Sequence, residues 1–143
     1  MGSLNRSQLS CKLNSACDCV HVLCSMVEVM SRRAGLNDKE TNRMVLAADE
    51  LFANIGQHGY HGQEGLIEMI AECHDGSLCF EFRDYAAPLT NEAVLHRKTM
   101  DASQAEPGGL GLYLIHASVD KLQHRVLDDG NRWLLIKYLH ARS

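Results

Sequence analysis

The sequence lacks the features that mark nucleic-acid-binding, membrane and secreted proteins. Its 143 residues have a net charge of −4 and include no long basic run, so we expect no direct binding to nucleic acid. No apolar segment reaches the roughly 18 residues of a membrane span, and no signal-peptide pattern opens the chain. These absences predict a soluble cytoplasmic protein without membrane contact.

The sequence also lacks the spacing of a zinc site or of a disulfide scaffold. Four of its six cysteines lie close together as C-x5-C-x-C-x4-C, which is not a zinc spacing, and no two histidines are arranged as H-x3-H. A chain that is 45% hydrophobic can form a core without covalent staples. We expect reduced, structural cysteines, with Cys73 and Cys79 acting as small apolar residues in strands. Metal binding through a cluster of protein ligands is not expected.

One domain is expected, because no repeat, low-complexity segment or linker divides the sequence. Residues 1–8 are predicted to be a disordered or vector-derived N-terminus, and residues 9–143 to form the domain. Its first element is a short strand over 9–13. Apolar residues then recur at intervals of three and four, which predicts an amphipathic helix over 15–34 that Gly35 ends.

A second helix begins at Asn37 and Glu40, whose spacing is that of a helix-capping pair, and ends near Gly59. Its apolar face is formed by Met44, Val45, Ala48, Leu51, Phe52 and Ile55. An adjacent face carries Arg43, Ala47, Glu50, Asn54 and Gln57. The carboxylate of Glu50 and the amide of Asn54, one turn apart, can jointly hold a hydrated divalent cation or orient a water. Taken alone, the pair fits a solvated helix edge better.

The second half of the chain predicts two β-hairpins separated by a loop and a third helix. Residues 66–73 and 78–83 alternate in polarity around a turn. The later of these strands places on one face Leu78, Phe80 and Phe82. A polar loop follows over 91–105, and the glycine cluster then opens a helical pattern of Leu112, Leu114, Ile115, Val119 and Leu122. Residues 123–127 and 132–139 complete the second hairpin. The predicted fold is α+β, a two-layer α/β sandwich with a mostly antiparallel sheet and helices on one face.

Three motifs carry the chemistry of this sequence. The first is a helical Glu50-x3-Asn54-x3-His58. The second is Asp84 at a strand end, followed by a turn of Tyr85, Ala86, Ala87 and Pro88. The third, at a helix start, is Gly108-Gly109-Leu110-Gly111-Leu112. Free backbone N–H groups and the positive end of a helix dipole suit phosphate at such a glycine-rich start, although each motif taken alone is common.

In this order the motifs resemble the N-box, G1 box and G2 box of the GHKL superfamily, the gyrase, histidine-kinase and MutL type of ATPase. The resemblance is greatest to the stand-alone anti-sigma-factor serine/threonine protein kinases, whose N-box reads E-x-x-x-N-x-x-x-H-G-Y, as Glu50 to Tyr60 does. Three further segments resemble those kinases: Phe82-Arg83-Asp84, the glycine segment from Gly108 to Leu112, and the closing turn Asp129-Gly130-Asn131-Arg132. The resemblance covers nearly the whole chain and implies a single histidine-kinase-like ATPase domain.

The resemblance implies a Mg-ATP site. Asn54 would bind the Mg²⁺ that bridges the phosphates, and Glu50 would be the general base for the hydroxyl of a protein serine or for water. Asp84 would accept a hydrogen bond from the adenine amino group and select ATP over GTP. ATP or ADP would also be contacted by His58 and by two loop segments, which comprise Ala86, Ala87, Pro88, Gly108, Gly109, Leu110, Gly111 and Leu112.

Other parts of the implied site have two interpretations. Residues 91–107 would form a lid, in which Arg97 and Lys98 either reach a phosphate or are solvated. Tyr60 and Tyr85 either line the site or pack structurally.

The turn after the strand departs from the family pattern. Glycine is common where this chain has Ala86 and Ala87, and alanine disfavours positive φ. Tyr85 is also bulkier than the residue often found there. We expect these differences to weaken nucleotide binding without abolishing it.

The resemblance implies an anti-sigma factor with serine/threonine protein kinase activity. Such a protein binds a sigma factor and phosphorylates a STAS-type anti-sigma-factor antagonist in a partner-switching system. We expect a homodimer. The first predicted helix is a candidate partner surface, on which Arg32 and Arg33 are either contact residues or simply solvated.

Two other functions are open. A non-catalytic module of the same fold would sense nucleotide or sequester a partner, and the turn at Ala86 and Ala87 favours it. The catalytic domain of a sensor histidine kinase would need an upstream histidine followed by an acidic residue, whereas His21 precedes Val22. ATP-dependent phosphorylation of an antagonist serine would separate the kinase from the module.

Overall fold

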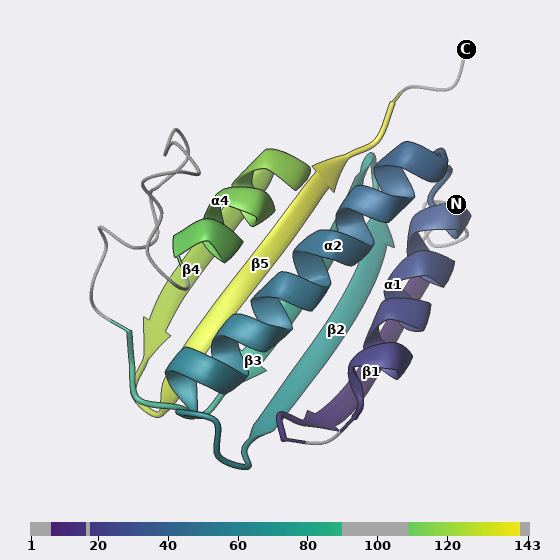
Figure 1. Ribbon diagram of the computed structural model, residues 1–143. Helices are drawn as coiled ribbons and strands as arrows, with labels where there is room; N and C mark the ends of the chain where they lie inside the picture. Colours follow the sequence, from purple (N-terminus) through teal and green to yellow (C-terminus); the bar gives the residue numbers. More distant parts are fainter. Residues whose placement is uncertain (1–6, 17, 90–108, 141–143) are drawn as a thin grey trace.

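Three α-helices and a π-helical turn cover one face of a five-stranded sheet in the computed structural model, which describes residues 7–16, 18–89 and 109–140 (Figure 1). The elements are, in order, β1 (Ser7–Asn14), α1 (Val20–Arg33), α2 (Asp38–Asn54), η2 (Ile55–Gly59), β2 (Leu66–His74), β3 (Ser77–Asp84), α4 (Gly109–Ser118), β4 (Lys121–Leu127) and β5 (Gly130–Tyr138). The sheet order is β1-β2-β3-β5-β4, and neighbouring strands pair antiparallel. The predicted α+β sandwich with helices on one face is confirmed.

Alternating polarity determines which side of each strand packs against the helices. β3 fully buries Leu78, Phe80 and Phe82 on one face, as predicted. From the opposite layer, α1 contributes the fully buried Leu23 and Val27. Full burial of each such side chain contributes about 1.5–3 kcal/mol relative to exposure, so this shared core stabilises the two layers against each other.

Helix α1 begins at Val20, later than the start predicted at Ser15. The backbone N–H of Ser15 donates to the carbonyl of Gly65 at 2.8 Å, so this residue is committed to the connection beside the sheet and not to a helix. The predicted end of the helix is confirmed. Gly35 follows its last turn with a φ of 93°, a conformation that glycine adopts without strain.

Asn37 caps α2 as the sequence predicted. Its side-chain oxygen accepts the backbone N–H of Glu40 at 2.8 Å, and the Glu40 carboxylate accepts the N–H of Asn37 at 3.3 Å. This second bond lowers the pKa of the Glu40 carboxyl. The helix runs to Asn54 and continues as η2, where the N–H of Tyr60 donates to the carbonyl of Ile55 at 3.0 Å. The π-helical turn was not predicted.

Two residues differ from their predicted places. Ala47, expected on the polar face of the second helix, is fully buried. Leu122, expected in the third helix, lies in β4 opposite Leu135, because α4 ends at Ser118. The N–H of Asp120 already donates to a carbonyl of β5 at 3.0 Å, which commits the chain to the sheet before Leu122 is reached.

The described residues contain neither a disulfide nor a helix that is long and apolar enough to cross a membrane. Five cysteines lie in this part of the chain, and all five have free thiols. Burial raises the pKa of the Cys79 thiol to about 11, so the thiol is protonated and unreactive at neutral pH.

Candidate functional site

Glu50 and Asn54 lie half-buried in the last turns of α2, one helical turn apart. The side-chain nitrogen Nδ2 of Asn54 is buried and has no hydrogen-bond partner among the described residues. A buried N–H group without a partner lowers the stability of the fold by about 1–3 kcal/mol. The nitrogen and the oxygen of an amide are told apart by their hydrogen-bond partners. The Nδ2 donor of Asn54 therefore lacks, within the described part of the chain, the partner that a buried donor needs.

The side-chain oxygen of Asn54, not its Nδ2, would be the magnesium ligand that the resemblance implied. Mg²⁺ usually takes one or two protein oxygens and fills its other positions with water and phosphate. In the part of the chain that the structure describes, no group of three or more His, Cys, Asp or Glu side chains could hold a metal ion. A cation at Asn54 would take its remaining ligands from water and phosphate, and the side-chain oxygen of Asn54 is a hard ligand of the right kind.

The N-terminus of α4 supplies the third motif. Residues 109–112 form its first turn, and α4 lies beside α2 on the same face of the sheet (Figure 1). The first N–H groups of a helix have no partner within it and favour anions. Gly108 and the predicted lid of residues 91–107, including Arg97 and Lys98, lie outside the described residues.

Asp84 ends β3 as predicted, and its carboxylate is enclosed by other groups. The residue is only 1% exposed. Its Oδ1 accepts hydrogen bonds from the backbone N–H of Ala86 at 3.1 Å and from Nδ2 of Asn131 at 3.0 Å. Its Oδ2 accepts one from Nε1 of Trp133 at 2.9 Å. A buried carboxylate requires hydrogen-bond donors, and these three groups supply them.

Asn131 connects this carboxylate to the segment that follows β3. Its Oδ1 accepts the N–H of Leu89 at 2.8 Å and is 2.9 Å from Nε2 of His124, while its Nδ2 also donates to the carbonyl of Ala87 at 3.2 Å. Because an amide oxygen only accepts, His124 carries a proton on Nε2. The His124 ring also packs against the Trp133 ring, with 4.3 Å between centroids.

The sequence prediction missed Asn131, Trp133 and His124 as parts of this site. One signal was available, because Asn131 occupies a strand position of the same parity as Trp133 and Leu135 and so was due to face the core. Sequence spacing could not show that Asn131 lies directly opposite Asp84 in the register between β3 and β5.

The turn after Asp84 accommodates its alanines without backbone strain. Among the described residues, the non-glycine positions with positive φ are His61 and Asp75, so neither Ala86 nor Ala87 adopts such a φ. Glycine is therefore not required here for its conformational freedom. The expected weakening of nucleotide binding finds no support in the backbone of this turn.

The methyl group of Ala86 packs against the end of the first motif. A Cβ added at Gly59 would lie 3.2 Å from the Cβ of Ala86, which is tighter than most real Cβ contacts, so glycine at position 59 eases the close approach. Ala86 is buried, whereas Ala87 and Pro88 are exposed. The first and second motifs thus meet at this contact.

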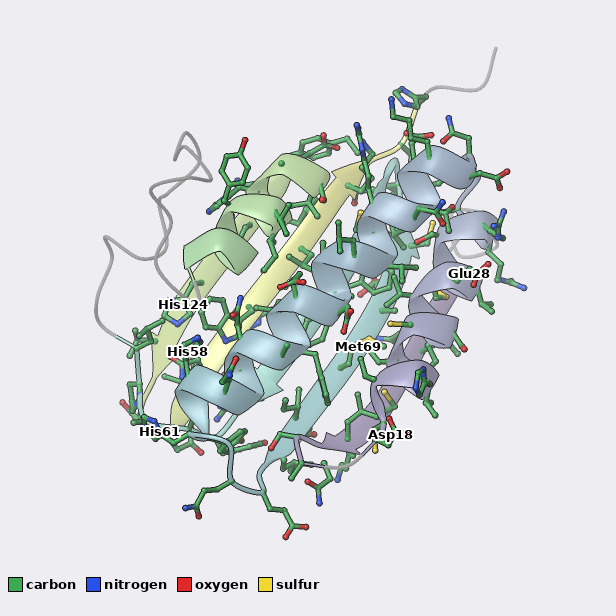
Figure 2. All side chains as sticks on the ribbon, in the orientation of Figure 1. Asp18, Glu28, His58, His61, Met69 and His124 are labelled. Carbon is green, nitrogen blue, oxygen red and sulfur yellow. The ribbon has the colours of Figure 1, made fainter. Side chains whose placement is uncertain are left out.

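Tyr60 also joins these two motifs. Its hydroxyl accepts the N–H of Tyr85 at 2.8 Å and donates to the carbonyl of Leu66, and burial raises the pKa of this hydroxyl, so it remains protonated. Tyr85 is 44% exposed, with its ring 4.1 Å from the Arg83 guanidinium. These contacts are structural ones. His58 is exposed in η2, and Figure 2 places it at the end of α2.

Tyr60→Phe is expected to lower the free energy of unfolding by about 1–3 kcal/mol, because the N–H of Tyr85 and the carbonyl of Leu66 both lose their partner. Urea denaturation followed by circular dichroism measures the change. Tyr138→Phe is the control, since Tyr138 is 54% exposed and its effect should stay within about 0.5 kcal/mol. Equal stability of the Tyr60 variant and the native chain would show that this hydroxyl does not brace the turn.

The fold and these residues together define a class of protein. A carboxylate–amide pair on one helix, an aspartate at a strand end and a glycine-opened helix, all on one antiparallel sheet, are the parts of a nucleotide-binding ATPase domain. A comparison with protein-family models agrees, because residues 13–137 match the histidine kinase-like ATPase domain. The chain belongs to this family, as its motifs indicated, and membership implies nucleotide binding.

A solved structure has a similar fold. It is the crystal structure of the RsbU and RsbW domains of Rv1364c from Mycobacterium tuberculosis, with a TM-score of 0.66 and 16% sequence identity. The match covers 96% of this chain and 34% of the other, so this chain spans about a third of the length of that one. No curated protein matches the sequence. At this identity the similarity establishes the fold.

Proposed function

We propose that this protein is a cytoplasmic anti-sigma factor with serine/threonine protein kinase activity. It binds Mg-ATP, holds a sigma factor and phosphorylates a STAS-type antagonist in a partner-switching system. Support comes from family membership, from the fold shared with a structure that contains an RsbW domain, and from the motif between Glu50 and Tyr60. A non-catalytic module of the same fold is the alternative to be tested.

The observation that carries this proposal is the position of Asn54, whose side-chain Nδ2 is buried without a partner among the described residues, one turn from Glu50. In the proposed reaction the antagonist's serine hydroxyl attacks the γ-phosphorus of ATP, a P–O bond forms to the serine oxygen, and the bond to ADP breaks. Glu50 accepts the serine proton. Asn54 holds Mg²⁺, which when bound neutralises phosphate charge. The first turn of α4 contacts phosphate through backbone N–H groups.

The partner surface is proposed to lie on α1. Arg32 is engaged within the chain, to Glu28 at 3.2 Å and Asp38 at 2.7 Å, which makes the exposed Arg33 the better candidate for an intermolecular contact. The same edge of the sheet exposes three apolar side chains, Leu9, Val22 and Val29. Exposed apolar groups beside an edge strand suit the proposed homodimer or a protein partner.

Calorimetric titration tests the binding half of this proposal. The native chain should bind ATP and ADP in the presence of Mg²⁺, and Asn54→Ala should weaken magnesium-dependent binding at least about tenfold through loss of an oxygen ligand. Gln57→Ala is the matched control, because it removes an exposed amide from η2 and should leave binding unchanged. Equal binding with and without Asn54 would contradict its metal role, and no binding by the native chain would contradict the kinase.

The catalytic half is tested by incubating the native chain with ATP, Mg²⁺ and a STAS-type antagonist. Mass spectrometry should then find phosphoserine on the antagonist. A chain that binds ATP but leaves the serine unmodified would favour the non-catalytic module.

A further inference from the structure

The carboxylate of Asp84 has one open acceptor position. A carboxylate offers about four lone-pair positions. The N–H of Ala86 at 3.1 Å and Nδ2 of Asn131 at 3.0 Å fill those of Oδ1, and Nε1 of Trp133 at 2.9 Å fills one on Oδ2. Within the described residues no further donor reaches this carboxylate, which leaves one position on Oδ2.

We propose that Asn131 and Trp133 determine the base specificity of the nucleotide site, because they leave Asp84 a single acceptor position that the amino group of adenine fills. This inference rests on the proposed ATP site. An amino group donates to the open position, whereas the carbonyl oxygen of guanine or hypoxanthine would bring two acceptors together there. Sites built around a buried hydrogen-bonding group reject analogues that leave it unpaired.

The two donors are held in place by the sheet. Asn131 lies opposite Asp84 in the register of β3 and β5, and Trp133 lies opposite Phe82. Both are buried, with 2% and 6% of their surface exposed. The amide of Asn131 cannot turn over without losing the bonds that its oxygen accepts, and the indole packs on the His124 ring. The open position on Oδ2 therefore has a defined direction.

Burial makes it unfavourable to leave the open acceptor position of Asp84 unfilled. Asp84 is 1% exposed, so little bulk water competes for the remaining lone pair. In such surroundings an unfilled acceptor on a charged group is unfavourable, and a donor from the ligand removes that penalty. A ligand without the donor leaves the penalty in place, which is the physical basis of discrimination.

Trp133→Phe tests this inference because it keeps a ring and removes the N–H. Oδ2 of Asp84 then has two open positions, and the carboxylate loses one of three bonds that orient it. It can turn to accept the N1–H of hypoxanthine, so inosine triphosphate becomes a better ligand relative to ATP. We expect the ratio of the dissociation constant of inosine triphosphate to that of ATP to fall about tenfold. This change is equivalent to one hydrogen bond to a charged group. Asn131→Thr should shift the ratio in the same direction.

Phe80→Leu is the matched control. Phe80 is fully buried on the same face of β3 as Asp84, on the order of 13 Å away along the strand. This variant should lower the thermal midpoint and leave the nucleotide ratio unchanged. A merely structural role for Trp133 would produce the same pattern in Trp133→Phe. If Trp133→Phe does not fold, the nucleotide ratio of Asn131→Thr and the tryptophan fluorescence of the native chain test the proposal.

The native chain offers a direct measurement, because Trp133 is its one tryptophan and its fluorescence reports on this position alone. ATP is expected to shift the emission, since its amino group shares Oδ2 with the indole N–H. Inorganic tripolyphosphate, which lacks a base, is expected to leave the emission unchanged. Calorimetry confirms saturation in each case.

The outcomes separate the two proposals. ATP that binds without changing the emission, together with an unchanged nucleotide ratio in both variants, overturns the role of Asn131 and Trp133 and leaves the ATP site standing. An equal shift by tripolyphosphate and ATP also overturns it. A native chain that binds no ATP overturns both proposals.

Discussion

Glu50→Gln is expected to slow phosphoryl transfer to the antagonist about 10²–10⁴-fold, the usual contribution of a general base. Glutamine has nearly the shape of glutamate but cannot take the proton of the attacking serine. Glu50 is half-buried and makes no hydrogen bond within the described residues, so the exchange leaves no partner unpaired there. A single-turnover phosphorylation assay at saturating ATP measures the rate, and calorimetry should give an unchanged ATP affinity.

Asp49→Asn is the matched control, because it removes the same charge one residue away. Burial, and then the carboxylate of Asp49, raises the pKa of the Cys24 thiol on α1, so Asp49 lies on the side of α2 that faces α1. This variant should transfer phosphate at the native rate. Equal losses of rate in both variants would mean that the negative charge of α2, and not a base at Glu50, determines the rate of phosphoryl transfer. Full activity of Glu50→Gln would contradict its role as the base.

Most of the fold could be predicted because its signals act over a few residues. The capping pair of Asn37 and Glu40 spans one turn, and the end of α1 is marked by Gly35 directly after its last turn. The alternation of Leu78, Phe80 and Phe82 shows directly which side of β3 faces the core. The order of these local elements was sufficient to predict a helix-covered antiparallel sheet, which the structure confirms.

The surroundings of Asp84 could not be predicted, because they depend on distant pairing. Asn131 and Trp133 lie 47 and 49 residues further along the chain. Alternation predicts that both face the helices, but only the register between β3 and β5 brings them to Asp84. The predicted start of α1 was wrong for a similar reason, since Ser15 is held by Gly65 next to the last residue pair of β1 and β2. A motif residue such as Asp84 could therefore be found from the sequence, whereas the residues that bond to it from a distant strand, Asn131 and Trp133, could not.

Gly130→Ala is expected to destabilise the domain by about 4 kcal/mol, from overpacking and backbone strain together. Gly130 has a φ of 153°, and an added Cβ would lie 2.0 Å from the carbonyl oxygen of Asp84 and 2.8 Å from Cα of Tyr85. Both are backbone atoms, so they cannot move aside as a flexible side chain could. Because the displaced segment carries Asp84, ATP affinity should fall together with stability.

Gly76→Ala separates crowding from backbone strain. Gly76 has a φ of 84° in the hairpin between β2 and β3, and nothing lies within 4 Å of an added Cβ. Its replacement should cost about 1–2 kcal/mol and leave ATP affinity unchanged. A domain of this size loses roughly 3 °C of thermal midpoint per kcal/mol, so the Gly130 variant should unfold several degrees lower. Equal midpoints would mean that contact with Asp84 is not what requires glycine at 130, and Asp84 would then be positioned by its side-chain hydrogen bonds alone.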